Sequence, residues 1–188
     1  MKRGLLIILS GPSGVGKGTV REQLFANPKL NLAYSISMTT REKKKGEREG
    51  IDYFFVDKDR FLKALERDEL LEHAVFVGNY YGTPRKYVED LRDKGFNVVL
   101  EIEVEGAKQV IDKCPDAISL FLVPPSLEEL ECRIKNRHTE TEEVIQKRLN
   151  KAKYEMQLLD IYTHVIINDN VDRARDEITD ILLRYINK

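Results

Sequence analysis

Cysteine, net charge and long apolar runs are all scarce in this sequence of 188 residues. The two cysteines, Cys114 and Cys132, show no metal-binding spacing, so we expect two reduced thiols in a cytoplasmic protein. A net charge of −1 provides no overall field that would favour nucleic acid or a membrane as a partner. The apolar run after the basic N-terminus covers only Leu5–Leu9, which is too short for a signal peptide or a membrane span.

Apolar segments alternate with segments of helical periodicity along most of the chain. Four apolar segments are predicted to be buried strands: Leu5–Ser10, Val98–Glu103, Ala117–Val123 and His164–Asn168. Strands that are apolar throughout and are separated by helices are typical of a parallel sheet covered on both faces. With 41% hydrophobic residues, the length suits one domain with a substantial core. We therefore predict a single α/β domain.

Two segments depart from this alternation. Residues 33–83 contain short strands of alternating polarity without long helices between them, which predicts a small, partly antiparallel lobe inserted into the core. Residues 133–159 include a highly charged helix, from Thr141 to about Asp160, with little apolar surface to bury, and this segment is predicted to be a mobile helical lid. The core then comprises residues 1–32, 84–132 and 160–188.

A glycine-rich segment follows the first predicted strand directly. Its spacing, Gly11-x-x-x-x-Gly16-Lys17, is that of a phosphate-binding P-loop (Walker A), which indicates a P-loop NTPase-type core. Backbone N–H groups and a helix N-terminus bind polyphosphate, and glycine lets the backbone come close. The alternative is an ordinary glycine-rich turn between a strand and a helix. The hydroxyl residue expected directly after the lysine is Gly18, and a hydroxyl comes one residue later, at Thr19.

Charged residues elsewhere leave two interpretations open. Arg133, Arg137 and Arg148 could bring positive charge to a phosphoryl group on closure of the lid. On composition alone, a solvated charged face is the favoured interpretation of these arginines. Glu101 and Glu103 lie at the end of a predicted core strand, where ligands bind in open parallel sheets, so we favour a function for both.

The predicted lobe carries a second group of candidates. Hydroxyls and cations that could hold a second phosphate are Ser37, Arg41, Lys44, Tyr53 and Tyr81. A tight hairpin with aromatic packing is the alternative for residues 80–82. Glu72 interrupts the apolar segment Leu70–Val75, and alternation alone favours its exposure to solvent over a hydrogen bond from a base.

Six segments in order give the sequence a family resemblance. They are Gly11–Thr19, Ser35–Arg41, Gly50–Phe55, Gly78–Thr83, Leu100–Gly106 and Pro124–Ser126. Through them the chain resembles the guanylate kinase family over about residues 4–186. The resemblance implies transfer of the γ-phosphoryl group of ATP to GMP or dGMP, giving ADP and GDP in purine nucleotide metabolism, with Mg²⁺ as the cofactor.

The resemblance also implies a role for each candidate residue. Those that bind ATP would be Gly11, Pro12, Ser13, Gly14, Val15, Gly16, Lys17, Gly18, Thr19 and Asn168. Those that bind GMP would be Ser37, Arg41, Lys44, Tyr53, Glu72, Tyr81, Thr83 and Glu103. The catalytic residues would be Lys17, Arg41, Arg133, Arg137 and Arg148. Thr19 and Glu101 would lie at the magnesium ion, in part through water.

The sequence departs from the family pattern at four positions. Lys44 replaces a common arginine and loses its bidentate fork. His138 replaces a glycine beside Arg137, and Glu101 and Glu103 replace aspartates.

Two other functions are compatible with the same fold. A kinase of ribose 1,5-bisphosphate needs no residues that read guanine, so Glu72 and Thr83 argue against it. A catalytically inactive module that binds phosphoproteins would lack the P-loop lysine or the lid arginines, which this chain has. We expect small-molecule substrates, neither nucleic acid nor membrane as a partner, and leave the oligomeric state open.

Overall fold

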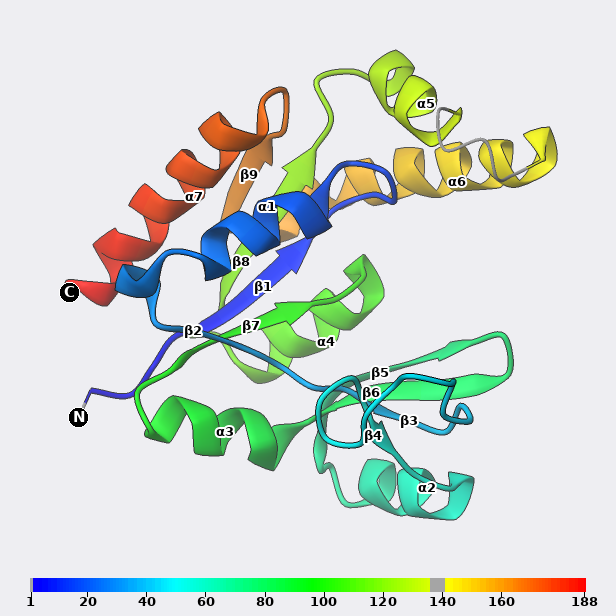
Figure 1. Ribbon diagram of the computed structural model, residues 1–188, viewed down its shortest axis with the longest axis vertical. Helices are drawn as coiled ribbons and strands as arrows, with labels where there is room; N and C mark the ends of the chain where they lie inside the picture. The colour runs from blue at the N-terminus through cyan, green and yellow to red at the C-terminus, as the bar shows by residue number, and fades with distance from the viewer. Residues whose placement is uncertain (1, 136–140) are drawn as a thin grey trace.

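The computed structural model describes residues 2–135 and 141–188, and a five-stranded parallel sheet lies at its centre (Figure 1). The strands are, in order across the sheet, β2 (Leu32–Tyr34), β7 (Asn97–Glu101), β1 (Leu6–Ser10), β8 (Ile118–Val123) and β9 (His164–Ile167). Each neighbouring pair is parallel. The predicted α/β fold with a parallel core is thus confirmed.

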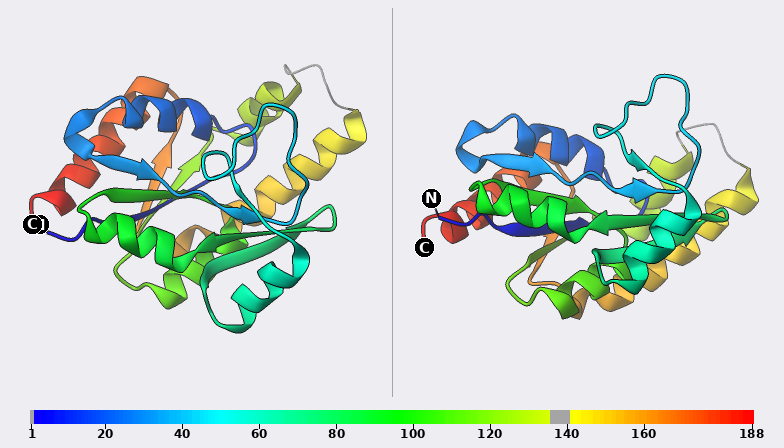
Figure 2. Two further views of the ribbon diagram at one scale, coloured as in Figure 1. Left: turned by 60° about the horizontal axis from the view of Figure 1, so that its bottom comes forward. Right: turned by 90° about the horizontal axis from the view of Figure 1, so that it is seen from below.

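Helices cover both faces of this sheet (Figure 2). All side chains of β1 are buried, and their alternation directs Ile7 and Leu9 to one face and Leu6 and Ile8 to the other. The first face packs against α1 (Lys17–Phe25) and α7 (Val171–Ile186). The second face packs against α3 (Arg85–Asp93) and α4 (Val104–Lys113). A short 3₁₀ turn, Pro28–Leu30, follows α1.

Two predicted strands are shorter than expected. The strand predicted to end at Glu103 ends at Glu101, and Glu103 is the N-cap residue of α4. A further strand, which the sequence pattern predicts over residues 32–37, stops at Tyr34 and pairs with β7, so residues 33 and 34 lie in the main sheet and not in the predicted lobe. Glu103 is therefore at a helix N-terminus.

A second sheet of four strands has the order β4-β3-β6-β5. Its strands are β3 (Met38–Thr39), β4 (Phe54–Phe55), β5 (Leu70–Phe76) and β6 (Asn79–Pro84). β3 and β4 are parallel, whereas the other pairs are antiparallel, in agreement with the mixed sheet that the sequence predicts. Helix α2 (Lys58–Glu66), capped by Asp57, closes a small separate core that includes Phe61. Pro84 ends β6 and is the N-cap residue of α3.

Helices α5 (Leu127–Lys135) and α6 (Glu142–Glu155) pack against one another beyond the main sheet. The sequence predicts little apolar surface on α6, and this prediction is wrong. Ile145, Leu149 and Ala152 form a buried stripe against Leu130 and Ile134 of α5. The helix also ends at Glu155 and continues as a 3₁₀ turn, Met156–Ile161. The break predicted at residues 137–139 lies outside the described residues. In the described ranges, every helix is too short or too polar to cross a membrane.

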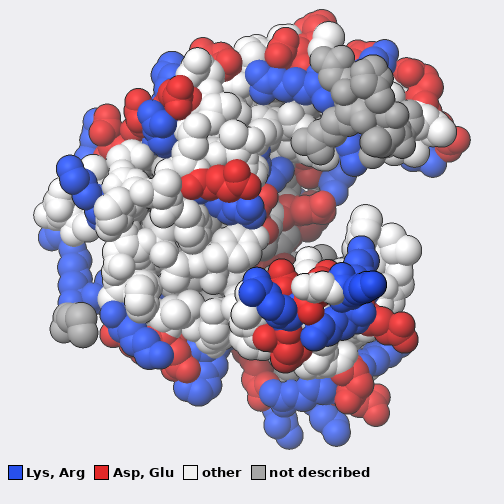
Figure 3. Space-filling view, viewed as in Figure 1, with Lys and Arg blue, Asp and Glu red and all other residues white. Residues whose placement is uncertain are grey.

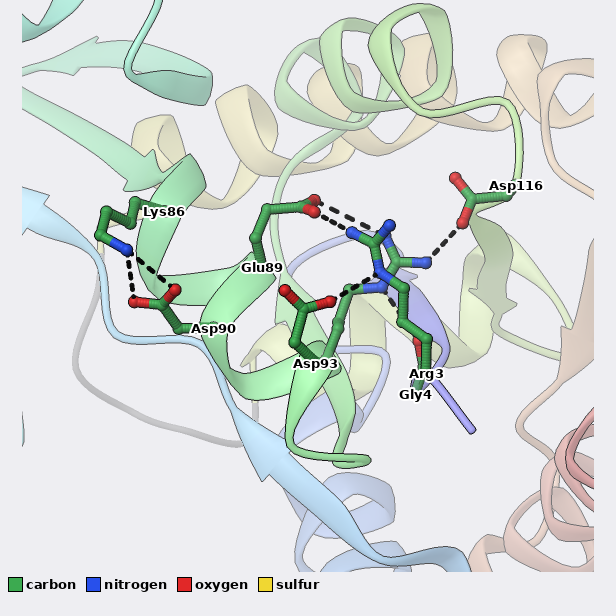
Figure 4. Close-up of polar contacts among 8 residues, drawn as sticks. Arg3, Gly4, Lys86, Glu89, Asp90, Asp93 and Asp116 are labelled. Carbon is green, nitrogen blue, oxygen red and sulfur yellow. Dashed lines mark hydrogen bonds and ion pairs between the residues drawn. The ribbon is translucent and has the colours of Figure 1, made fainter. Parts of the chain in front are cut away.

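Arg92 is a buried arginine that joins α3 to Gly4, which precedes β1. Figure 4 labels its partners Gly4, Glu89 and Asp116. Only 5% of the residue is exposed, and its Nε donates to the carbonyl of Gly4 at 3.0 Å. Its guanidinium pairs with Asp116, and with Glu89 at 3.7 Å. On the same helix, Lys86 forms an exposed ion pair with Asp90 at 2.9 Å.

Replacement of Arg92 by alanine should lower the free energy of unfolding by about 2–3 kcal/mol, because buried carbonyl and carboxylate partners lose their donor. The matched control is Lys86→Ala on the same helix, which should cost less than about 0.5 kcal/mol because its ion pair is exposed. Urea denaturation of both variants checks this expectation. Equal losses for the two variants would contradict the structural role given to Arg92.

Candidate active site

The glycine-rich loop connects the carboxyl end of β1 to the first residue of α1. A Cβ at Gly11 would lie 2.6 Å from the carbonyl oxygen of Leu122 in the neighbouring strand. Gly16 has a φ of +97°, and a Cβ there would lie 2.7 Å from Nδ2 of Asn168. Glycine is thus required at both positions by close approach of other atoms, and at Gly16 also by backbone conformation. The loop directs the N-terminus of α1 at the space where an anion would bind.

Lys17 lies folded over this loop. Its Nζ donates to the carbonyl of Gly11, and to that of Pro12 at 3.2 Å. Burial lowers the pKa of the Lys17 amine, and the nearby carboxylate of Glu101 opposes this shift. Thr19 is exposed on α1, and a Cβ at Gly18 would have no atom of the described residues within 4 Å.

A cavity of about 260 Å³ lies beside the loop. It brings together residues from the P-loop, the end of β7 and helix α6: Gly11, Ser13, Lys17, Glu101, Ile102, Glu103, Arg148, Lys151 and Glu155. Figure 3 shows a deep hollow between the part built by α5 and α6 and the part built by the four-stranded sheet. The site thus lies at the carboxyl ends of the strands, as expected for an open parallel sheet.

The acidic residues of this cavity are paired with cations. Glu101 accepts from Arg21 of α1 at 2.8 Å, and Glu103 accepts from Lys151 of α6 at 2.7 Å. Glu155 is 5% exposed, and burial raises its pKa, which Lys151 opposes. Sequence reasoning missed Arg21, Lys151 and Glu155, because nothing in their local pattern distinguishes them from other charged helix residues.

The described residues contain no group of three acidic, cysteine or histidine side chains close enough to hold a metal ion. This donor set fits a magnesium ion that is bound mainly by phosphate and water, with Glu101 available to hold a water ligand. Thr19, the other predicted metal residue, is exposed on α1 and is not among the residues that line the cavity.

Glu72 is buried, contrary to the exposure that alternation along β5 favours. Only 6% of it is exposed, and the hydroxyl of Thr83 donates to its Oε1 at 2.5 Å. The physical reason is that α4 covers this face of β5. Gln109 of α4 makes hydrogen bonds of 3.0 Å to both the N–H and the carbonyl of His73. Burial raises the pKa of Glu72, and the Thr83 hydrogen bond opposes this shift.

Arg41, Tyr53 and Tyr81 also come together. The Arg41 guanidinium lies 5.4 Å from the ring centre of Tyr53, which packs edge-on against Tyr81 at 6.0 Å. Glu47, which sequence reasoning missed, binds Arg41 through two bonds of 2.7 and 3.1 Å and accepts from the backbone N–H of Lys44. The hydrogen bond from Arg41 lowers the pKa of Glu47. The side chain of Lys44 is exposed, and Ser37 lies half-buried before β3.

The predicted lid arginines are placed differently from one another. Arg133 pairs with Glu129 at 3.0 Å and also donates to the carbonyls of Asn168, at 3.1 Å, and Val15. Arg148 lines the cavity, whereas Arg137 and His138 lie outside the described residues. Asn168 is buried and donates from Nδ2 to the carbonyl of Val15 at 2.7 Å, so it supports the P-loop directly.

Comparison with known proteins shows which family this chain is similar to. A family model described as guanylate kinase matches residues 3–185. A guanylate kinase of Mycoplasma mycoides is 57% identical over 182 residues, which cover 97% of this chain and 61% of that protein. This chain thus spans less than two thirds of that relative.

Solved structures are also similar. The crystal structure of guanylate kinase from Anaplasma phagocytophilum is 37% identical and has a TM-score of 0.75, with 100% of this chain and 88% of that chain covered. The crystal structure of an uncharacterized protein from Eubacterium ventriosum is 13% identical and has a TM-score of 0.50, with 96% of this chain and 98% of that chain covered. At this identity the match shows similarity of fold alone.

Thr83→Val should lower the free energy of unfolding by about 2 kcal/mol at neutral pH, because the buried Glu72 carboxylate loses its hydroxyl donor. The raised pKa of Glu72 means that folding favours its neutral acid. The loss should therefore be complete above the raised pKa and shrink as the pH falls through it. Denaturation at neutral and acidic pH, with Thr83→Ser as the control that keeps the hydroxyl, measures this. A loss that is the same at every pH would contradict it.

Proposed function

This chain belongs to the guanylate kinase family, and on that premise we propose that it transfers the γ-phosphoryl group of ATP to GMP or dGMP, giving ADP and GDP. The observation that carries the proposal is the buried carboxylate of Glu72, which Thr83 orients within the four-stranded sheet. One side of the cleft would hold a donor polyphosphate, and the other would hold a base.

Guanine suits this carboxylate chemically. Its N1–H and 2-amino groups lie side by side, so one carboxylate accepts from both. Adenine places a bare N1 acceptor at the same point, which would leave Glu72 unpaired and repelled. A nucleotide that leaves a buried polar group of the site unpaired is discriminated against strongly. Glu103, now paired with Lys151, is the second carboxylate that we assign to the base.

Arg41 is suited to the phosphate of the acceptor. Its fork holds the carboxylate of Glu47 in a bidentate arrangement that a phosphate can also adopt. Tyr53 and Tyr81 lie beside it and would add hydroxyl donors, with Ser37 and Lys44 from the same lobe. Because the attacking oxygen belongs to the GMP phosphate itself, the reaction needs no strong base from the protein.

The donor side uses the P-loop amides and Lys17. On ATP binding, the Lys17 amine would exchange the carbonyls of Gly11 and Pro12 for phosphate oxygens. A bound magnesium ion neutralises charge on the donor phosphates, and Glu101 would hold one of its water ligands. Asn168 supports the loop from the side where we expect adenine.

We assign the lid to residues 133–159, the acceptor lobe to 35–83, since residues 33 and 34 lie in the main sheet, and the core to the remainder. Arg133, Arg137 and Arg148 would surround the transferring group on closure, which also excludes water. The bond between Lys151 and Glu103 already links α6 to the acceptor side of the cleft. The free thiols of Cys114 and Cys132 support a cytoplasmic location for this activity.

A coupled assay of ADP release with GMP, dGMP, AMP, UMP and ribose 1,5-bisphosphate as acceptors tests the proposal. We expect turnover with GMP and dGMP, and a kcat/KM for AMP that is lower by on the order of 10⁴. Glu72→Gln should reduce kcat/KM for GMP by on the order of 100-fold, because its amide donates where the carboxylate accepts. The KM for ATP should change little.

Two results would contradict the proposal. Turnover with ribose 1,5-bisphosphate in place of GMP would assign the chain to the other kinase activity. Absence of turnover with every acceptor, from a folded protein that still binds GMP, would favour a binding module.

A further inference from the structure

Gly106, in the first turn of α4, has an unusual neighbour. The three heavy atoms nearest to a Cβ built on Gly106 all belong to Glu72: Oε2 at 2.8 Å, Cδ at 3.4 Å and Cγ at 3.5 Å. The volume that an alanine methyl group would occupy is therefore already in contact with this side chain. A separation of 2.8 Å between a methyl carbon and a carboxylate oxygen is below van der Waals contact, so the side chain would have to move.

The surroundings leave the carboxylate little alternative space. Its other oxygen accepts from Thr83, and the residue is buried. The helix and the strand cannot easily separate, because Gln109 binds both backbone groups of His73 and Lys113 binds the carbonyl of Leu70 at 2.9 Å. A side chain at position 106 would therefore displace the Glu72 carboxylate and leave α4 and β5 in place.

Backbone conformation does not explain this glycine. Gly106 lies inside a helix, and it is not among the described residues of positive φ. Alanine is the better helix former at such a position, because glycine loses more conformational freedom on folding. The glycine thus weakens the helix, and the close approach of Glu72 is the structural reason that accounts for it.

We propose that Gly106 is a positioning residue for guanine recognition, which holds the Glu72 carboxylate in the acceptor site by leaving room for it. This inference rests on the proposed function, because it assigns Glu72 to the base. It adds a residue that touches neither substrate and that determines specificity through the space beside it.

The test is the kinetics of Gly106→Ala in the full chain. The KM for GMP should rise, so that kcat/KM falls on the order of 100-fold. A loss of this size is expected when the Glu72 carboxylate, which binds the base, is displaced by about 1 Å. The kcat and the KM for ATP should change much less. Asp112→Ala, which adds an alanine at an exposed position in the last turn of α4, is the control and should behave as wild type.

Glu72→Asp provides the rescue. Aspartate is one methylene shorter, so it should lower kcat/KM in the wild-type background but relieve the clash with the methyl group introduced at position 106. The fold-loss of kcat/KM for GMP in the double variant should then be smaller than the product of the fold-losses in the two single variants. If Gly106→Ala does not fold, its clash with Glu72 is the expected reason. The double variant relieves this clash and must then fold.

The outcomes separate the two proposals. If the wild type does not phosphorylate GMP, the proposed function fails. If the wild type is active but Gly106→Ala has the wild-type KM for GMP, the role of Gly106 is overturned. It is also overturned if the loss of kcat/KM in the double variant equals the product of the losses in the two single variants.

Discussion

A buried carboxylate is costly in free energy unless it has partners, and Glu72 is buried between a strand and the first turn of a helix. Burial raises its pKa, and the hydrogen bond from Thr83 opposes this shift. A ligand that donates two adjacent hydrogens would satisfy the carboxylate, and one that presents an acceptor would not. In the proposed function, the specificity of the acceptor site would therefore follow from the way in which Glu72 is buried.

Helix α4 is the element that makes this arrangement possible. It begins directly after β7, whose last residue, Glu101, lies in the cavity beside the P-loop. Its N-cap residue, Glu103, binds Lys151, and Glu105 accepts from the hydroxyl of Tyr154, both on α6. Its buried face carries Gly106 against Glu72. The start of one helix thus contacts the parallel core, the second sheet and the helix assigned to the lid.

Much of this could be predicted from the sequence. The parallel core follows from apolar strands separated by helices, and the P-loop follows from the spacing of Gly11, Gly16 and Lys17. The alternation of apolar and polar residues along β5 predicted that Glu72 is exposed, and this was wrong. Such a pattern does not show which face of a strand is covered by a helix that is distant in the sequence. The apolar stripe of α6 was likewise obscured by its many charges, although Ile145, Leu149 and Ala152 are spaced for one face. Partners such as Lys151 for Glu103 and Glu47 for Arg41 depend on tertiary contacts, which local patterns do not contain.

Equilibrium binding of GMP and inosine monophosphate would show whether one buried carboxylate reads both donors of guanine. Inosine monophosphate keeps N1–H and lacks only the 2-amino group. Isothermal titration should show that it binds the wild type at least about tenfold more weakly than GMP, since a hydrogen bond to a charged group contributes about 1.5–3 kcal/mol. In Glu72→Gln this difference should disappear. Equal affinities of the wild type for the two nucleotides, or a difference that persists in Glu72→Gln, would mean that Glu72 does not read the 2-amino group.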